Sequence, residues 1–199
     1  MALDVFLEKG YEPTTMEEIA QRVGMSKRTV YARYPEKSAL FKAAVQRAVD
    51  TYTVSIEAVG AVATDKLEGT LVAVARQRIA NIATPNGIKL QRILTAQSHR
   101  FPELFHAAFE QGTGPTIAFL EELFRHYTRR GEIRVIEPRR AATAFLSLAA
   151  GGPARAIVAG ERLEERDIDK HVRFAVRLFL DGVRPRRRVT RSSSRSRRR

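Results

Sequence analysis

Apolar side chains recur every three or four positions along most of this chain, which is the spacing of one face of an α-helix. Glycine and proline interrupt the spacing, and no alternation of apolar and polar residues is long enough to predict a strand. The pattern therefore predicts an all-α protein. In its larger part, helices are expected over residues 65–83, 88–100, 103–111, 116–130, 138–150 and 167–181, with breaks at 85–87, 112–115 and 151–153 and a short helical piece ending at 159. Gly131 and Gly182 are expected to cap the helices before them.

The first part of the chain predicts shorter helices. A helix over residues 2–9 is expected to end at Gly10. Thr15 opens a second helix, because a threonine at the N-cap and Glu18 three residues later form a capping box. Gly24 permits a tight turn after this helix, since glycine adopts a positive φ without steric cost.

Ser26 is expected to cap a third helix, and Pro35 ends it because the residue before a proline avoids the helical region. A fourth helix starts near Glu36 and meets no breaker before Gly60. The second and third helices are short and meet at a glycine, and the third is rich in basic and hydroxyl side chains. This arrangement is typical of a helix-turn-helix, which places its second helix in the major groove of DNA.

The net charge of +13 is divided unevenly along the chain. Residues 186–199 hold eight arginines and no acid, which leaves +5 for residues 1–185. The Arg- and Ser-rich tail, residues 185–199, cannot bury apolar area and is expected to be disordered. It either adds non-specific affinity for phosphates or is a dispensable terminus or reading-frame artefact. Between Arg22 and Arg47, seven basic residues against Glu36 give a local +6 that coincides with the helix-turn-helix.

The composition argues against several other classes of protein. The chain has no cysteine, and His99, His106 and His126 do not have the spacing of a metal site. The motifs of serine hydrolases, zinc proteases, P-loop proteins and dinucleotide-binding enzymes are absent, so we predict neither an enzyme nor a cofactor. No apolar run reaches the ~18 residues of a membrane helix, and the N-terminus does not read as a signal peptide. We therefore expect a cytoplasmic protein without a membrane partner.

Two blocks of the N-terminal sequence resemble the TetR family of bacterial transcriptional regulators. They are FLEKGYEPTTMEEIA at residues 6–20 and VGMSKRTVYARYPEKSALF at residues 23–41, and the resemblance covers about the first 47 residues. HRFPELF at residues 99–105 and EIRVIEPRRAA at residues 132–142 resemble the AefR-type C-terminal region of that family. Members usually carry a longer first helix after a basic arm, so here either the start codon is assigned too late or the arm is lacking.

The resemblance implies a homodimer that reads a palindromic operator in double-stranded DNA, with recognition helices about one turn, roughly 34–36 Å, apart. Residues 1–46 would form the helix-turn-helix DNA-binding domain, and residues 47–184 a helical domain for effector binding and dimerisation. Release from the operator by an unidentified small-molecule effector would make the protein a repressor, the usual mode of the family. The alternative is a constitutive dimeric DNA-binding protein without an effector.

The family's DNA contacts map onto seven residues of this chain. Thr15 and Lys37, each at the start of a helix, would meet phosphates. The exposed start of the recognition helix would reach base edges, and a guanidinium there can hydrogen-bond guanine O6 and N7 together, so Arg28 is the main candidate for base readout. A phosphate contact or a solvated side chain is its alternative. Tyr31 and Tyr34 would present their ring hydroxyls to the DNA backbone, and packing is the alternative for Tyr31. The full set is Thr15, Lys27, Arg28, Thr29, Tyr31, Tyr34 and Lys37.

The resemblance also implies a small-molecule pocket among the middle helices, lined by large apolar residues and a few polar groups. From Gly69 to Pro102 the chain has no acid, so Arg76 or Arg92 could point inward to pair with an anionic effector, or could face solvent. Plain core is the alternative for the apolar candidates. The predicted lining is Arg92, Leu94, Gln97, Phe101, Phe105, Phe109, Leu120, Phe124 and Tyr127.

The last two long helices suit a four-helix interface between two copies of the chain. Small residues on the first of them permit close approach, and the second carries an apolar stripe at helical spacing. This stripe faces either the partner or the chain's own core. The residues are Ala141, Ala142, Ala149 and Ala150 on the first helix and Ile168, Val172, Ala175 and Phe179 on the second.

Overall fold

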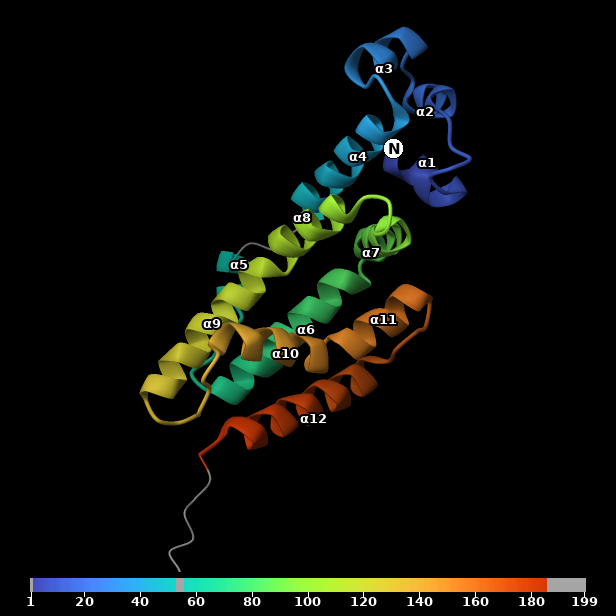
Figure 1. The fold of residues 1–199 in the computed structure, drawn as a ribbon. Helices are drawn as coiled ribbons and strands as arrows, with labels where there is room; N and C mark the ends of the chain where they lie inside the picture. Colours follow the sequence, from blue (N-terminus) through green and yellow to red (C-terminus); the bar gives the residue numbers. More distant parts are fainter. Residues whose placement is uncertain (1, 53–55, 186–199) are drawn as a thin grey trace, which may run out of the picture.

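The computed structural model describes residues 2–52 and 56–185, so the predicted tail lies almost wholly outside the described residues. The described part of the chain forms α-helices and no strand, which confirms the all-α prediction. The molecule is elongated, with α2 and α3 at one end and α12 at the other (Figure 1). The helices are α1 Ala2–Lys9, α2 Met16–Val23, α3 Lys27–Arg33, α4 Lys37–Tyr52, α5 Ile56–Gly60, α6 Leu67–Ala83, α7 Pro85–Gln97, α8 Pro102–Gly112, α9 Gly114–Arg129, α10 Pro138–Ala149, α11 Gly151–Ala159 and α12 Glu165–Val183.

The capping residues of the N-terminal helices act as predicted. Thr15 Oγ1 accepts a hydrogen bond from the Glu18 amide (3.2 Å), and Glu18 Oε2 accepts one from the Thr15 amide (3.1 Å), which completes the capping box of α2. Gly24 has a φ of 71°, the left-handed conformation that ends α2 and turns the chain towards α3. The Ser26 hydroxyl accepts from the Thr29 amide (3.1 Å) and caps α3. The predicted helix-turn-helix is thus confirmed.

Of the predicted fourth helix, the structure describes α4 as far as Tyr52 and α5 from Ile56 to Gly60, and residues 53–55 lie outside the described residues. Helix α7 begins at Pro85 instead of residue 88, since Pro85 occupies its first turn and Thr84 caps it. The ends of α6 and α7 approach so closely that a Cβ on Gly87 would lie 2.4 Å from the carbonyl oxygen of Asn81. This position therefore requires glycine. From helical spacing alone, Gly87 is predicted to be part of a break between helices.

Two glycine assignments in the last third of the chain were also wrong. Residues 151–153 do not interrupt the helical pattern for long, because α11 begins at Gly151 directly after the end of α10. Gly182 lies inside α12 and does not cap it, and the cap is Arg184 in an extended conformation. Gly131, by contrast, has the expected left-handed φ of 72° after α9.

Two apolar clusters organise the molecule. The larger, here called the body cluster, lies mainly among α6, α9, α10 and α12, and Phe124 and Phe145 are among its fully buried side chains. The second, the N-terminal cluster, joins α1–α4 to Leu90 and Leu94 of α7 and to Phe101 between α7 and α8. By packing, α7 and part of α8 therefore belong with the N-terminal helices, although they follow residue 46 in the sequence.

Four aromatic rings, here called the aromatic junction, form the centre of the N-terminal cluster: Phe6, Tyr11, Phe41 and Phe101. The centroid of the Phe101 ring lies 5.2 Å from that of Tyr11 and 5.1 Å from that of Phe41. Phe6 and Phe41 are in edge-to-face contact at 5.0 Å. Rings at these separations attract one another beyond the burial of their area, so Phe101 fixes the body helices to the N-terminal ones.

Polar contacts surround the aromatic junction. Lys42 Nζ lies 2.7 Å from Glu103 Oε1, and Lys89 Nζ lies 3.0 Å from Asp4 Oδ1. The guanidinium of Arg100 stacks 4.5 Å above the Tyr11 ring. Exposed ion pairs contribute only ~0–1 kcal/mol each, so we assign most of the stability of this interface to the buried rings.

The burial of the apolar stripe on α12 shows which way it faces. Val172 and Ala175 are fully buried in the body cluster, and Phe179 stacks on Phe124 with ring centroids 5.2 Å apart. Ala142 and Ala149 of α10 are buried in the same cluster, as is Ala150. Ala141 and Ile168 pack against it while staying partly exposed. The stripe thus faces the chain's own core.

In the part of the chain that the structure describes, no single helix is long and apolar enough to cross a membrane. Helices α10 and α11 pass the length and composition test only as a pair bent by 45°. Their apolar residues Phe145, Leu146 and Ile157 are buried in the body cluster.

Removing the Phe101 ring should show how much the aromatic junction stabilises. We expect Phe101→Ala to lower the free energy of unfolding by about 3–5 kcal/mol, because the substitution leaves a cavity between packed rings. Ile136, which is 84% exposed, provides the control, and Ile136→Ala should change the free energy by no more than about 0.5 kcal/mol. Urea denaturation at one protein concentration measures both. Similar losses in the two variants would contradict the central role of Phe101.

Candidate DNA-binding face and ligand cavity

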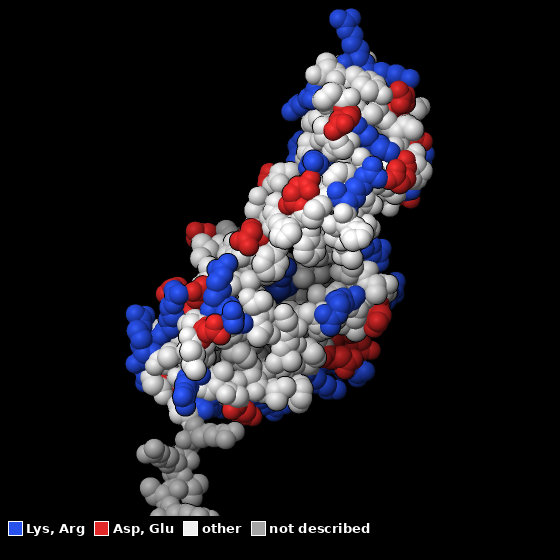
Figure 2. All heavy atoms as spheres, in the orientation of Figure 1, with Lys and Arg blue, Asp and Glu red and all other residues white. Residues whose placement is uncertain are grey.

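Helix α3 presents most of its side chains to solvent. Val30 is its only buried residue, and it anchors the helix to the N-terminal cluster. Lys27, Arg28 and Thr29 are exposed at the start of the helix, and Tyr31 is 44% exposed one turn on. Figure 2 shows basic side chains projecting from the end of the molecule that α3 occupies in Figure 1. The helix therefore has the exposure that reading base edges requires.

The carboxylate of Glu17, which the sequence analysis did not single out, organises this face. The Tyr31 hydroxyl donates to Glu17 Oε1 (3.3 Å), and Lys27 Nζ lies 3.5 Å from the same oxygen. The pKa of Glu17 is lowered by a hydrogen bond from its own backbone amide and then by Lys27 and Tyr31. The carboxylate thus stays ionised near neutral pH and holds two predicted DNA-contacting side chains on one side of α3.

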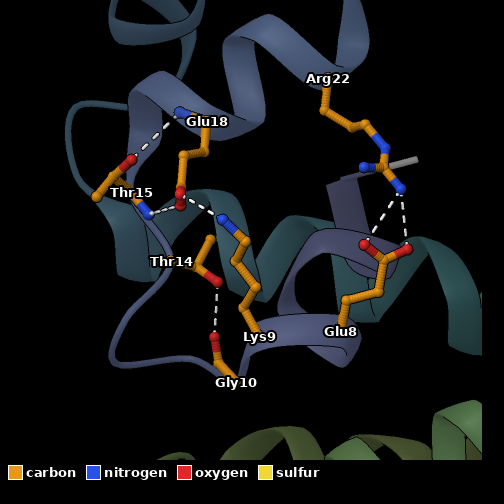
Figure 3. A network of polar contacts seen from close by, with 7 residues as sticks. All are labelled: Glu8, Lys9, Gly10, Thr14, Thr15, Glu18 and Arg22. Carbon is orange, nitrogen blue, oxygen red and sulfur yellow. Dashed lines mark hydrogen bonds and ion pairs between the residues drawn. The ribbon is translucent and has the colours of Figure 1, made fainter.

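Helix α2 is held to α1 at both of its ends by polar contacts (Figure 3). Glu18, besides completing the capping box, receives Lys9 Nζ at 2.5 Å from Oε1. Arg22 donates through Nη2 to both carboxylate oxygens of Glu8, at 2.9 and 3.1 Å. The Thr15 hydroxyl already accepts the capping bond, but it is exposed and keeps its own proton to donate. This network fixes the position from which Thr15 is predicted to meet a phosphate.

Lys37 has a structural role in addition to the predicted one. Its ammonium donates to the carbonyl oxygens of Tyr11 (2.9 Å) and Glu12 (2.8 Å) and lies 4.6 Å above the Tyr11 ring. An ammonium has three N–H donors, so one remains for a phosphate. Tyr34 ends α3 and packs half-buried against the N-terminal cluster, with the guanidinium of Arg33 5.7 Å from its ring centroid.

A cavity of about 440 Å³ lies in the body between α6, α7, α8, α10 and α11. Figure 2 shows a hollow in the middle of the molecule, near the place where α6, α7 and α8 converge in Figure 1, with basic atoms visible inside it. Val49 of α4 also reaches the wall. The lining contains Arg78 and Arg155 and no Asp or Glu. The cavity wall therefore combines apolar side chains with positive charge.

A second cavity, of about 680 Å³, lies between α1, α3, α4 and α7. Its wall includes Asp4, which pairs with Lys89, and the backs of helices that carry the DNA-binding face. We regard the body cavity as the better candidate for a ligand, because two phenylalanines line it and its two arginines have no acidic residue beside them in the wall, whereas the wall of the second cavity includes Asp4.

Comparison with known proteins identifies the family. The model of bacterial regulatory proteins of the tetR family matches residues 1–44, and that of the AefR-like transcriptional repressor C-terminal domain matches residues 69–182, more than half of the chain. The chain belongs to the TetR family of transcriptional regulators. It is therefore a DNA-binding regulator and not an enzyme.

Solved structures of TetR regulators share the fold. The chain is 30% identical to the flavonoid-responsive regulator FrrA, with 94% of each chain covered and a TM-score of 0.71. It is 29% identical to a putative TetR-family regulator from Mesorhizobium loti, with 92% of this chain and 93% of that chain covered and a TM-score of 0.72. The transcriptional activator FasR from Mycolicibacterium smegmatis is 43% identical over 49 residues, which are only 25% of this chain and 22% of FasR.

The structure divides the predicted ligand-binding residues of this TetR regulator. Leu94, Phe105 and Phe109 line the body cavity together. Phe101 instead belongs to the aromatic junction, and Gln97 lines a void of about 10 Å³ beside that junction. Helical spacing placed Phe101 and Leu94 on one stripe, but the chain ends α7 between them and directs the ring towards the N-terminal helices.

Helix α9 contributes less to the cavity than predicted. Leu120 and Phe124 are fully buried in the body cluster, away from the cavity wall. Tyr127 packs against the same cluster, with the guanidinium of Arg130 5.9 Å from its ring centroid. In this structure the three side chains are therefore part of the core, which was the alternative to a ligand-binding role, because residues of α10 and α12 pack against the apolar face of α9.

The arginines of the acid-free stretch have separate environments. Arg76 is neutralised by Asp169 (3.1 Å) and Glu165 of α12, and Arg92 Nε donates to the Val158 carbonyl (2.8 Å). Neither lines the cavity, whereas Arg78 does. Helical spacing could have identified Arg78 as facing inward, because it lies on the face of α6 that carries the buried residues Leu71, Val74 and Ile82.

Base contacts and phosphate contacts can be distinguished by how strongly each depends on the DNA sequence. We expect Arg28→Ala to weaken binding to a selected operator by about 1–3 kcal/mol and to relax the preference at one base pair. Lys37→Gln retains a donor for the Tyr11 and Glu12 carbonyls but removes the charge. It should weaken binding to all sequences alike and reduce the salt slope by about 1. Fluorescence anisotropy with operator variants at several salt concentrations measures both, and equal losses across all operators in both variants would contradict the division.

Proposed function

We propose that this TetR regulator is a homodimeric repressor that binds a palindromic operator and leaves it when a small molecule enters the body cavity. The observation that carries the proposal is the position of the cavity. Its wall includes α7 and α8, and Phe101 between these helices is packed into the aromatic junction of the DNA-binding domain. A ligand in the cavity would therefore press on the two helices that hold the N-terminal domain in place.

The connection to α3 is short. Leu90 and Leu94 line the cavity and also belong to the N-terminal cluster, and Val49 of α4 lies in the cavity wall. Only three residues separate the end of α3 from the start of α4, so a shift of α4 moves the recognition helix. A ligand that prefers the shifted state would change the spacing of the two recognition helices, and its differential affinity limits the change in operator affinity.

The outer face of α12 supports the proposed dimer. Phe174 and Leu178 lie four residues apart, on one face of the helix, and are 57% and 52% exposed. Leu148 of the neighbouring α10 is 37% exposed. An exposed apolar face on two adjacent helices is typical of an interface between copies of a chain. We therefore propose that α10 and α12 pair with those of a second copy, in the cytoplasm where the DNA lies.

The dimer can be tested by placing a charge on this face. We expect Leu178→Glu to shift the protein to a monomer in analytical ultracentrifugation, because a carboxylate would be buried at the interface. Operator affinity should fall by tenfold or more, that is by about 1.4 kcal/mol, since one recognition helix reads half a palindrome. The control Ala80→Glu adds the same charge at an exposed position of α6 and should stay dimeric. A dimeric Leu178→Glu protein would contradict the proposed interface.

The response to a ligand has its own test. The similarity to the flavonoid-responsive FrrA makes flavonoids a first class of compounds to examine beside aromatic acids, and we expect a saturating compound from one of these classes to weaken operator binding about tenfold or more. Ala154→Phe, which fills part of the cavity wall, should bind the operator normally and lose the response. Anisotropy titrations measure both. If neither a panel of flavonoids nor a panel of aromatic acids changes operator affinity, the constitutive alternative is favoured.

A further inference from the structure

Arg78 is a cation in the cavity wall without a carboxylate partner among the described residues. Its Nη2 donates to Thr113 Oγ1 (2.8 Å), and its Nη1 donates to the carbonyl oxygen of Gly112 (3.4 Å). Arg76, two residues earlier on the same helix, has two acidic partners. Acidic side chains of α12 thus pair with the outer side of α6, whereas no acidic residue lines the cavity side.

The charge on Arg78 is poorly compensated. Burial lowers the pKa of the guanidinium, although an arginine side chain stays protonated in proteins. The cavity lining adds Arg155 and contains no acidic residue. Taking a charge out of water costs free energy that an anion at this position would offset. The guanidinium has five N–H donors and uses two, so donors remain for the two oxygens of a carboxylate.

The rest of the cavity suits a hydrocarbon ring. Leu90, Leu94 and Leu146 line it, and Phe105 and Phe109 of α8 face it with 44% and 38% of their surface still exposed. Exposed phenylalanines in a concave wall are free to stack on a planar ligand. A volume of about 440 Å³ is within the usual range for small-molecule sites, ~300–1,000 Å³.

We propose that the body cavity binds an aromatic monocarboxylate, with the carboxylate on Arg78 and the ring against Phe105 and Phe109. The inference rests on the proposed function in one respect, namely that this cavity is the effector site. It adds the chemical class of the ligand and the residue that selects it.

The partners of Arg78 connect this site to the DNA-binding domain. Gly112 ends α8 and Thr113 joins α8 to α9, so Arg78 holds the turn between these helices. A carboxylate that binds the remaining N–H groups would draw the guanidinium towards the cavity and so change both contacts. Helix α8 packs against α4, so a change at this turn reaches the helix that follows α3.

A purely structural role for Arg78 leads to a different expectation. A cation beside the last carbonyl of α8 stabilises the negative end of that helix, and this role requires no ligand. Comparing a charged ligand with a neutral one of the same shape distinguishes the ligand-binding role from the structural role. Loss of a helix-end contact lowers the melting temperature but does not change the discrimination between an acid and its amide.

The test uses 2-naphthoate and 2-naphthamide, which share a ring system and differ in charge, in isothermal titration calorimetry of the full chain without DNA. We expect the wild-type protein to bind naphthoate about tenfold or more tightly than naphthamide. Arg78→Gln, which keeps a donor for Gly112 and Thr113, should bring this ratio near one with little change for naphthamide. Arg92→Gln removes the same charge outside the cavity and should keep the wild-type ratio.

Three outcomes would overturn the proposal. Arg78→Gln could retain the wild-type ratio, the wild-type protein could bind both compounds equally, or neither compound could bind. Binding in the cavity between α1 and α4 would give the first of these results, because Arg78 is not part of that wall. A folded Arg78→Gln protein is verified by its circular dichroism and melting curve. Since no DNA is present, failure here is distinguishable from failure to bind an operator, which the anisotropy titrations report separately.

Discussion

The structure depends on the insertion of Phe101 into the aromatic core of the N-terminal helices. This ring comes from the link between α7 and α8, and it contacts Tyr11 and Phe41 at about 5 Å. A helix-turn-helix of this size has little apolar area of its own to bury. It therefore completes its core with residues of the body, and the N-terminal cluster and the body cavity share helices α7 and α8 as a consequence.

Shared helices explain how two distant sites could influence each other. Leu94 contacts both the cavity and the N-terminal cluster, and Lys37 at the start of α4 is bonded to the loop that carries Tyr11. Closely packed side chains do not deform continuously, so a change at one wall is passed on as a shift of a whole helix. The same packing explains why Lys37, predicted as a phosphate contact, also belongs to the frame that positions α3.

Two arginines on α6 show how the helical repeat gives neighbouring residues different environments. Arg76 and Arg78 are two residues apart, which places them about 200° apart around the helix axis. Arg76 therefore meets the acids of α12, and Arg78 meets the cavity and the end of α8.

The sequence by itself determined the features that depend on neighbours within about four residues. The capping box of Thr15 and Glu18, the turn at Gly24 and the exposed basic start of α3 all follow from local hydrogen bonds and backbone conformation. Helical spacing also gave the all-α fold. Tertiary structure alone decided which surface covers each face: the stripe on α12 faces the chain's own core, and Phe101 left the predicted pocket. Spacing shows which residues share a face, but only the packing of distant helices decides what that face meets.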